Sequence, residues 1–203
     1  MDLTVITPTR GRPDALSRCL DAFARQRHGL RAEHLVVADG PCPASARVVA
    51  RGGGPMTRYA EATRADPSRG DGPGANARDV GLAAALGDYV CFWDDDNEYA
   101  DHCLATLHAA AHGVDMGVCQ CVHRGPLPEY RGAIGCRIPD RHDGEFIAGR
   151  VDTMCVCVRA AVARASSPWA DGRGRGNDYR WIEGVRRAGA VVRFLPVVIG
   201  EHV

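Results

Sequence analysis

Lysine is missing from this sequence: all 25 basic residues are arginine, and they balance 25 acidic residues. The absence of lysine excludes a catalytic Schiff base and a P-loop lysine, so a side chain that holds phosphate must be arginine or histidine. The absence of net charge argues against sequence-independent binding to nucleic acid, which depends on a surplus of cations. We therefore expect no nucleic-acid partner.

Long apolar runs are also missing. No segment approaches the roughly 20 apolar residues that a membrane-spanning helix needs. Residues 1–4 lack the basic start and apolar core of a secretory signal. These absences predict a cytoplasmic protein without a transmembrane segment.

The nine cysteines are then expected to be reduced thiols, because disulfides are rare in the cytosol. Two C-x-C pairs, Cys119/Cys121 and Cys155/Cys157, place both sulfurs on one face of a strand, whereas structural zinc sites favour C-x₂₋₄-C turns. The spacing predicts buried thiols in strands, with a zinc site as the alternative.

The chain is long enough to fold as one domain, because a protein of 203 residues buries roughly 70% of its unfolded surface. Apolar runs predict strands at residues 3–7, 35–38, 88–93, 114–123, 153–158 and 191–195, the last ending before Pro196. Helical spacing predicts helices near 14–24, 75–86 and 179–188 and another that ends near Gly113. Residues 41–74 are predicted to be loops around one short strand. The alternation predicts an α/β fold with a mostly parallel central sheet flanked by helices.

Three successive carboxylates, Asp94, Asp95 and Asp96, follow the apolar segment 88–93. Their mutual repulsion is costly unless a cation relieves it. Residues i and i+2 can aim the same way, so Asp94 and Asp96 can share one hard divalent ion while Asp95 points elsewhere. The alternative is an acidic cap for the next helix. The cluster alone leaves both interpretations open.

Other polar residues are predicted to join this cluster. Asp39 ends the second strand, Thr9 and Arg10 follow the first, and Arg78 lies early in the helix before the acidic cluster. The carboxyl ends of strands in an open α/β sheet converge on one crevice. The sequence therefore predicts a binding crevice at this edge.

Five segments, in order, carry a resemblance to a known family. They are V-I-T-P-T-R-G-R at residues 5–12, L-V-V-A-D-G at 35–40, A-N-A-R-D-V-G-L-A-A-A-L-G-D-Y-V at 75–90, F-W-D-D-D-N at 92–97 and G-N-D-Y-R-W-I-E-G-V-R-R-A-G at 176–189. In these segments the sequence resembles the inverting family 2 glycosyltransferases of the GT-A fold. The resemblance implies a single GT-A domain over residues 1–203, with a nucleotide-sugar-binding half at 1–97 and an acceptor-binding and catalytic-base half at 98–203. Two positions depart from the family, which usually has acidic residues where this chain has Ala38 and Asn177.

The resemblance also implies how the donor is bound. Pro8, Thr9 and Arg10 would line the nucleotide pocket, and Asp39 would accept hydrogen bonds from the base or ribose. Arg78 would neutralise the diphosphate or hold the base; an exposed arginine without a role is the alternative. The implied donor is a nucleoside diphosphate sugar carrying UDP, GDP or dTDP.

The acidic cluster takes the metal in this family. Asp94 and Asp96 would hold Mn²⁺ or Mg²⁺ on the diphosphate, where the ion stabilises the leaving group. Asp95 is grouped with the nucleotide-sugar-binding residues. His202 is a further candidate metal ligand, and a surface residue near the chain end is the alternative.

Inversion needs a base that takes the proton of the attacking acceptor. Asp178 is the candidate, because it matches the family's late aspartate; a helix cap is the alternative role. Asp152, before the predicted strand at 153–158, is the second candidate base or an acceptor ligand. Trp169 lies in a predicted loop and is a candidate platform for the acceptor.

Two other functions compete with the glycosyltransferase. A sugar-nucleotide-forming nucleotidyltransferase is disfavoured because residues 8–13 contain arginines but neither a glycine run nor lysine. A non-catalytic nucleotide-sugar-binding module would account for Ala38 and Asn177. The acceptor, a hydroxyl or an amine, is unknown, and we expect residues 124–149 to select it. A homodimer stays open.

Overall fold

The structure is a computed structural model that describes residues 1–203 except 27–28, 125–135, 140–145, 167 and 175. In the described residues, nine strands form one sheet in the order β3-β2-β1-β4-β8-β6-β9-β5, with β7 paired to β6. The strands are β1 Leu3–Thr9, β2 Ala32–Asp39, β3 Thr57–Ala62, β4 Tyr89–Phe92, β5 Glu98–Tyr99, β6 Met116–His123, β7 Cys136–Ile138, β8 Val156–Arg159 and β9 Val192–His202.

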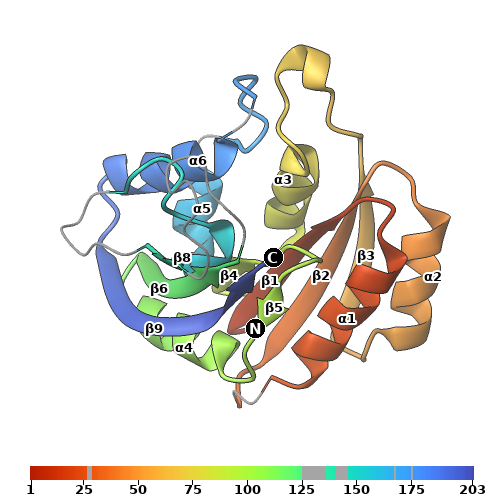
Figure 1. The fold of residues 1–203 in the computed structure, drawn as a ribbon, viewed down its shortest axis with the longest axis horizontal. Helices are drawn as coiled ribbons and strands as arrows, with labels where there is room; N and C mark the ends of the chain where they lie inside the picture. The colour runs from red at the N-terminus through yellow and green to blue at the C-terminus, as the bar shows by residue number, and fades with distance from the viewer. Residues whose placement is uncertain (27–28, 125–135, 140–145, 167, 175) are drawn as a thin grey trace.

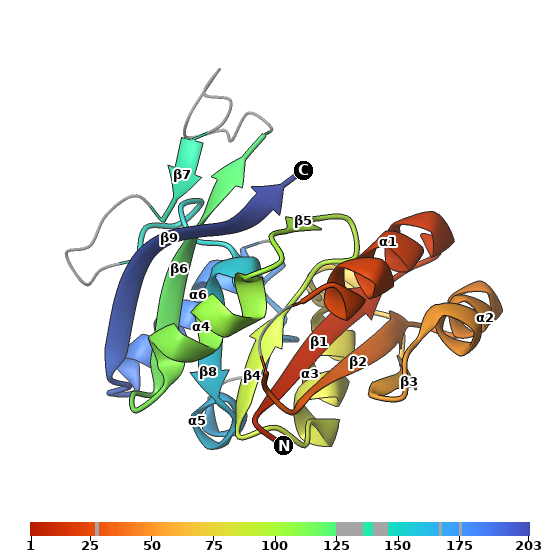
Figure 2. The same ribbon diagram turned by 90° about the horizontal axis from the view of Figure 1, so that it is seen from below.

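Helices cover both faces of the sheet. They are α1 Pro13–Ala24, α2 Pro43–Gly52, α3 Ala75–Ala84, α4 Cys103–Ala111, α5 Ala160–Ala165 and α6 Asn177–Arg187. Helices α1, α2 and α4 lie on one face and α3, α5 and α6 on the other (Figures 1 and 2). Side chains of β1 point alternately to the two faces of the sheet and pack against the helices there. Leu3 shares a hydrophobic cluster with Leu104 of α4, whereas Ile6 shares one with Ile182 of α6.

The first half of the sheet is parallel, as predicted. Strands β3, β2, β1 and β4 run in one direction, and Ile6 lies opposite Leu35 on one side and Phe92 on the other. All seven residues of β1 are buried, which is typical of a parallel strand covered by helices on both faces.

The second half of the sheet differs from the prediction. Strand β8 is antiparallel to both β4 and β6, while β9 is parallel to β6, so the sheet is mixed. A run of buried apolar residues looks alike in either strand direction, so the sequence could not show the reversal.

Three local predictions were wrong. Residues 43–52 form α2, with Pro43 in its first turn and Val49 buried, where loops were expected. Thr153–Cys155 is a 3₁₀ turn, because the Asp152 carboxylate accepts a hydrogen bond from Met154 N at 2.9 Å. Strand β9 runs past Pro196, which falls at a register irregularity opposite β6.

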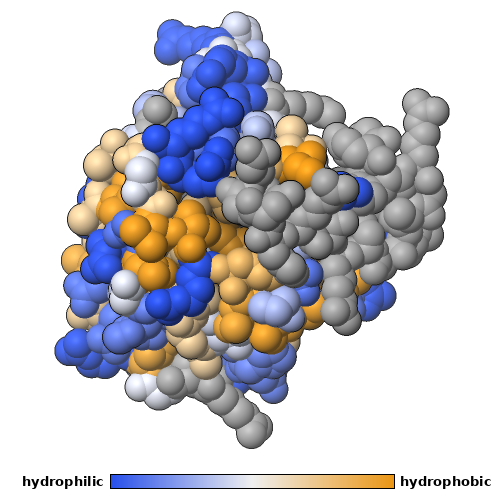
Figure 3. Space-filling model, turned by 90° about the vertical axis from the view of Figure 1, so that its left-hand side faces the viewer, coloured by the Kyte–Doolittle hydropathy of each residue, from blue (hydrophilic) through white to orange (hydrophobic). Residues whose placement is uncertain are grey.

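Strand β9 has a partly open outer edge. Among the described residues, β5 pairs only with Gly200 and Glu201 on that side. The face seen in Figure 3, which is the left side of Figure 1 where β9 lies, mixes apolar and polar surface. Pro196 and the exposed Arg193 lie in the open stretch, and both residue types hinder further strand pairing at an edge.

The C-x-C cysteines Cys119, Cys121, Cys155 and Cys157 are buried and free, which confirms the predicted burial. Within the part of the chain that the structure describes, no helix is long and apolar enough to cross a membrane.

Candidate functional site

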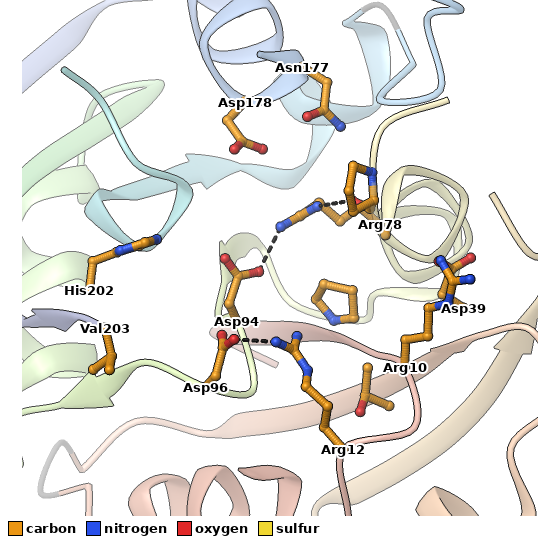
Figure 4. Close-up of a pocket in the computed structure, with 14 residues that line it drawn as sticks. Arg10, Arg12, Asp39, Arg78, Asp94, Asp96, Asn177, Asp178, His202 and Val203 are labelled. Carbon is orange, nitrogen blue, oxygen red and sulfur yellow. Dashed lines mark hydrogen bonds and ion pairs between the residues drawn. The ribbon is translucent and has the colours of Figure 1, made fainter. Parts of the chain in front are cut away.

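A cavity of about 500 Å³ opens where the first, second and fourth strands end. Its lining consists of Pro8, Thr9, Arg10, Arg12, Asp39, Pro73, Gly74, Arg78, Asp94, Asp96, Asn177, Asp178, His202 and Val203. The structure thus brings together nine of the predicted site residues (Figure 4). Asp95 and Asp152 do not belong to the lining in the described part of the chain.

Parallel register explains why residues far apart in the sequence meet here. Strand β1 ends at Thr9 and β2 at Asp39, and Asp94 follows β4 by two residues. These strands are neighbours, so their carboxyl ends meet at one edge of the sheet. Helix α3 starts beside this edge and packs closely on β1. The close approach is possible because Gly81 has no side chain: a Cβ there would lie 2.4 Å from the Ile6 side chain.

Arg78 is the buried cation of the cavity. It is 5% exposed, and its Nη2 donates to Asp94 Oδ1 at 2.7 Å. Its Nη1 donates to the Pro73 carbonyl at 3.1 Å, and its guanidinium carbon lies 5.1 Å from the centre of the Trp169 ring. The cation is therefore fixed by hydrogen bonds and by ring contact.

Trp169 has a different role from the predicted one. It is fully buried and stacks on Trp181 at 4.5 Å between ring centroids. Its backbone N–H donates to Asp79 Oδ1 at 2.9 Å. The expectation of an exposed acceptor platform was wrong, because Trp169 is a core residue that supports Arg78.

The other two carboxylates of the acidic cluster share Arg12. Asp95 is 1% exposed; its Oδ2 accepts from Thr9 Oγ1 at 2.6 Å, and its Oδ1 lies 2.5 Å from Arg12 Nη2. Arg12 Nη1 also donates to Asp96. Burial raises the pKa of Asp95 to about 6, against the opposing effects of Thr9 and Arg12.

Asp94 and Asp96 are the carboxylates that fit a divalent ion. Both line the cavity and offer hard oxygen ligands, which Mg²⁺ and Mn²⁺ prefer. Within the described ranges, no group of three or more His, Cys, Asp or Glu side chains is placed to hold a metal. The donor set therefore fits an ion that takes its remaining ligands from water and from a bound diphosphate.

Asp39 lies at the opposite side of the cavity from α6 (Figure 4). Its Oδ1 accepts from Ala65 N at 2.7 Å. Its buried Oδ2 has no hydrogen-bond partner among the described residues and lies 3.9 Å from Arg10 Nη1. One oxygen is thus available to a ligand, which the sequence position alone could not show.

Asp178 enters the cavity from the first turn of α6 (Figure 4). Its Oδ1 is buried and unpartnered as far as the described residues go. Burial raises the pKa of this carboxyl, and the charge of Arg78 opposes the effect. Gly176, and not Asp178, is the N-cap residue of α6.

Asp152 is paired with His202. Asp152 Oδ2 lies 3.4 Å from His202 Nε2. Burial raises the pKa of Asp152 to about 6, with His202 acting in the opposite direction. His202, the last residue of β9, also stacks on His123 at 4.6 Å between ring centroids. This histidine is therefore a partly buried residue of the sheet, which differs from the alternative of a surface residue near the chain end.

Sequence reasoning missed five lining residues, which are Arg12, Pro73, Gly74, Asn177 and Val203. Arg12 carries a charge from the same loop as Arg10, and that loop position was the available signal. Asn177 was noticed only as a departure from the family. It is 5% exposed, and its Nδ2 has no hydrogen-bond partner in the described ranges. Most of residues 124–149, expected to select the acceptor, lies outside the described residues.

Comparisons with known proteins give the family. The model of Glycosyl transferase family 2 matches residues 4–131. A solved structure of S. aureus TarS 1-349 in complex with UDP is 16% identical, with a TM-score of 0.72 over 100% of this chain and 60% of that one. The mannosyltransferase PcManGT from Pyrobaculum calidifontis, in complex with GDP-Man and Mn²⁺, is 19% identical, with a TM-score of 0.71 over 98% of this chain and 56% of that one.

A weaker likeness is to a 4-diphosphocytidyl-2C-methyl-D-erythritol synthase, with 13% identity and a TM-score of 0.57 over 97% of this chain and 89% of that one. No curated protein sequence matches. The chain spans about 60% of the TarS fragment and 56% of the mannosyltransferase. The family match covers more than half of the chain, and the fold agrees with it: the protein belongs to glycosyl transferase family 2 and has the GT-A fold.

Proposed function

We propose that this chain is a metal-dependent, inverting glycosyltransferase domain that transfers a sugar from a nucleoside diphosphate sugar to an acceptor hydroxyl or amine. One observation carries the proposal: a single cavity combines arginines, the carboxylates of Asp94 and Asp96, and a carboxylate oxygen of Asp178 that has no hydrogen-bond partner among the described residues. The first two groups suit a diphosphate with its cation, and the third suits a proton acceptor. The complexes of TarS with UDP and of the mannosyltransferase with GDP-Man support a donor of this class.

The two halves of the chain would divide the work. Residues 1–97 would bind the donor, with Asp39 accepting a hydrogen bond from base or ribose through its available oxygen. Arg10 and Arg78 would neutralise the diphosphate. Residues 98–203 would bind the acceptor and supply the base. We place Asp95 in support of the donor site, because it is buried under Thr9 and Arg12.

Asp94 and Asp96 would hold Mn²⁺ or Mg²⁺, which supplies positive charge to the departing diphosphate. His202 is a candidate further ligand, and Asp152 at 3.4 Å is placed to orient its ring. The mannosyltransferase complex with Mn²⁺ supports this choice of cation.

Asp178 would act as the base. The acceptor oxygen forms a bond to the anomeric carbon while the bond from that carbon to the phosphate oxygen breaks, and the acceptor proton passes to Asp178. The raised pKa of this buried carboxyl brings it nearer to neutral pH, which favours proton acceptance. Asp178 lines the cavity whereas Asp152 lies behind His202, and this difference supports Asp178 as the base.

The test is to incubate the protein and Mn²⁺ with UDP-, GDP- and dTDP-sugars and follow release of the nucleoside diphosphate. Slow hydrolysis by the wild type, lost in Asp178→Asn, is the expected result. Formation of a nucleoside triphosphate that depends on pyrophosphate would instead identify a nucleotidyltransferase. Binding without turnover in the presence of a range of hydroxyl and amine acceptors would identify a non-catalytic module.

A further inference from the structure

Two arginines neutralise the acidic cluster, and their side chains differ in exposure to solvent. Arg78 has a side chain only 6% exposed, and it is held between Asp94 and the Pro73 carbonyl beside Trp169. Arg12 has a side chain 46% exposed and reaches the cluster from the N-cap position of α1. Only the second of these cations has room to move.

Arg12 bridges two carboxylates of unlike character. Its Nη2 lies 2.5 Å from Oδ1 of Asp95, whose side chain is fully buried. Its Nη1 donates to Asp96, whose side chain is 42% exposed and lines the cavity. The planar guanidinium carries five donors, so one nitrogen can stay on Asp95 while another changes its partner.

This bridge conflicts with metal binding at Asp96. A cation that binds to Asp94 and Asp96 would share the Asp96 carboxylate with Arg12. The cation and the guanidinium are both positive, and like charges on one carboxylate repel each other. A diphosphate in the cavity removes the conflict, because Arg12 lines the same space and phosphate oxygens are good partners for guanidinium. Thr9 Oγ1 donates to Asp95 Oδ2 at 2.6 Å, and this bond does not involve Arg12, so the buried carboxylate keeps a partner when Arg12 turns.

We infer that Arg12 is the resident counter-ion of Asp96 and turns from Asp96 to the diphosphate when the donor enters, so that metal and nucleotide each strengthen the binding of the other. The inference rests on the proposed function. In this account Arg12 contacts the diphosphate of the donor, so it is a donor-binding residue. Coupling of this kind is reciprocal, so it is measurable from either ligand.

The neighbouring cations are less suited to this role. If Arg78 left its place, the carboxylate of Asp94 would lose its buried cation and its charge would be uncompensated. The acidic partner of Arg10 in the described residues is Asp39, at 3.9 Å, which does not belong to the metal-binding pair. Arg10 therefore offers a matched control of equal charge in the same cavity.

The experiment is calorimetric titration of Mn²⁺ into wild type, Arg12→Gln and Arg10→Gln, each alone and with saturating UDP, GDP or dTDP, whichever binds the wild type. Without nucleotide, Arg12→Gln should bind Mn²⁺ about tenfold more tightly than wild type, as expected for removal of one partly screened charge. The factor by which nucleotide strengthens Mn²⁺ binding should fall correspondingly in Arg12→Gln. Arg10→Gln should bind Mn²⁺ without nucleotide as the wild type does.

Suppose that the wild type binds a nucleoside diphosphate with Mn²⁺ but that Arg12→Gln, without nucleotide, binds Mn²⁺ no more tightly than the wild type does. This result would overturn the role inferred for Arg12 and would leave the proposed function standing. If the wild type binds none of the three diphosphates with Mn²⁺, the proposed function falls, and this inference falls with it. Thermal unfolding checks that Arg12→Gln folds. If it does not, the titration uses Arg12→Gln combined with Asp95→Asn, which removes the buried charge and keeps an acceptor for Thr9.

Discussion

Replacing Arg78 by methionine should destabilise the protein strongly, because it removes the buried cation beside the carboxylates of the cavity. Arg78 is 5% exposed and donates to Asp94 at 2.7 Å, and its charge also acts on Asp178 and Asp152. Removing one partner of a buried ion pair costs about 3–5 kcal/mol. The Asp94 side chain is 24% exposed, so we expect the lower end, about 3 kcal/mol at pH 7. Methionine keeps the apolar contact with Trp169.

Urea unfolding at two pH values measures this change. The loss should be smaller near pH 5 than at pH 7, because Asp178 and Asp152 have raised pKa values, that of Asp152 about 6, and can take up protons when the cation is gone. Adding Asp94→Asn should restore part of the stability. The control Arg10→Met alters a side chain 52% exposed and should cost less than about 1 kcal/mol. A loss of less than about 1 kcal/mol for Arg78→Met at pH 7, or one that grows on acidification, would refute the reasoning.

Three further predictions concern the base, the core and the pH dependence. Asp178→Asn should slow sugar transfer or donor hydrolysis by roughly 10²–10⁴-fold without weakening diphosphate binding; an equal effect of Asp152→Asn alone would shift the base to that residue. Trp169→Ala should lower the free energy of unfolding in urea by about 3–5 kcal/mol, and a loss like that of an exposed side chain would contradict its place beside Trp181. Burial lowers the pKa of His34 to about 3. As the pH falls below 6.5, unfolded His34 binds a proton that the folded ring does not. Wild type should then lose up to about 1.4 kcal/mol per pH unit relative to His34→Gln in urea titrations, and parallel curves would disprove this.

The sequence predicted the donor side of the cavity well. Asp39 is the last residue of an apolar strand and Asp94 comes two residues after another, and such strand ends converge in an α/β sheet. The family motifs then assigned these positions to donor and metal. Short-range pattern was sufficient here, because the three strands involved are parallel neighbours.

The other side of the cavity depends on contacts that no local pattern shows. Strand β8 reverses direction, and its apolar run would look the same either way. Trp169 lies in a segment with the composition of a loop, yet Asp79 fixes its backbone and Trp181 covers its ring. The pairing of Arg12 with Asp95 joins residues 83 positions apart, which the family resemblance did not assign.

The same distinction applies to helix α2. Pro43 and the glycines after Arg51 suggested a loop, although proline is favoured in a first helical turn. Tertiary contact decided the outcome, because Val49 packs with Leu16 and Leu20 of α1. A segment with weak helical propensity thus forms a helix because it packs against the apolar side chains of α1.

The most direct test of the account is calorimetric titration of UDP, GDP and dTDP, with and without Mn²⁺, into wild type and an Asp94→Asn/Asp96→Asn variant. The account predicts that one diphosphate binds the wild type when Mn²⁺ is present and binds at least about tenfold more weakly when either the ion or the two carboxylates are removed. Equal binding under all these conditions, or no binding of any diphosphate, would contradict a metal-dependent donor site in this cavity.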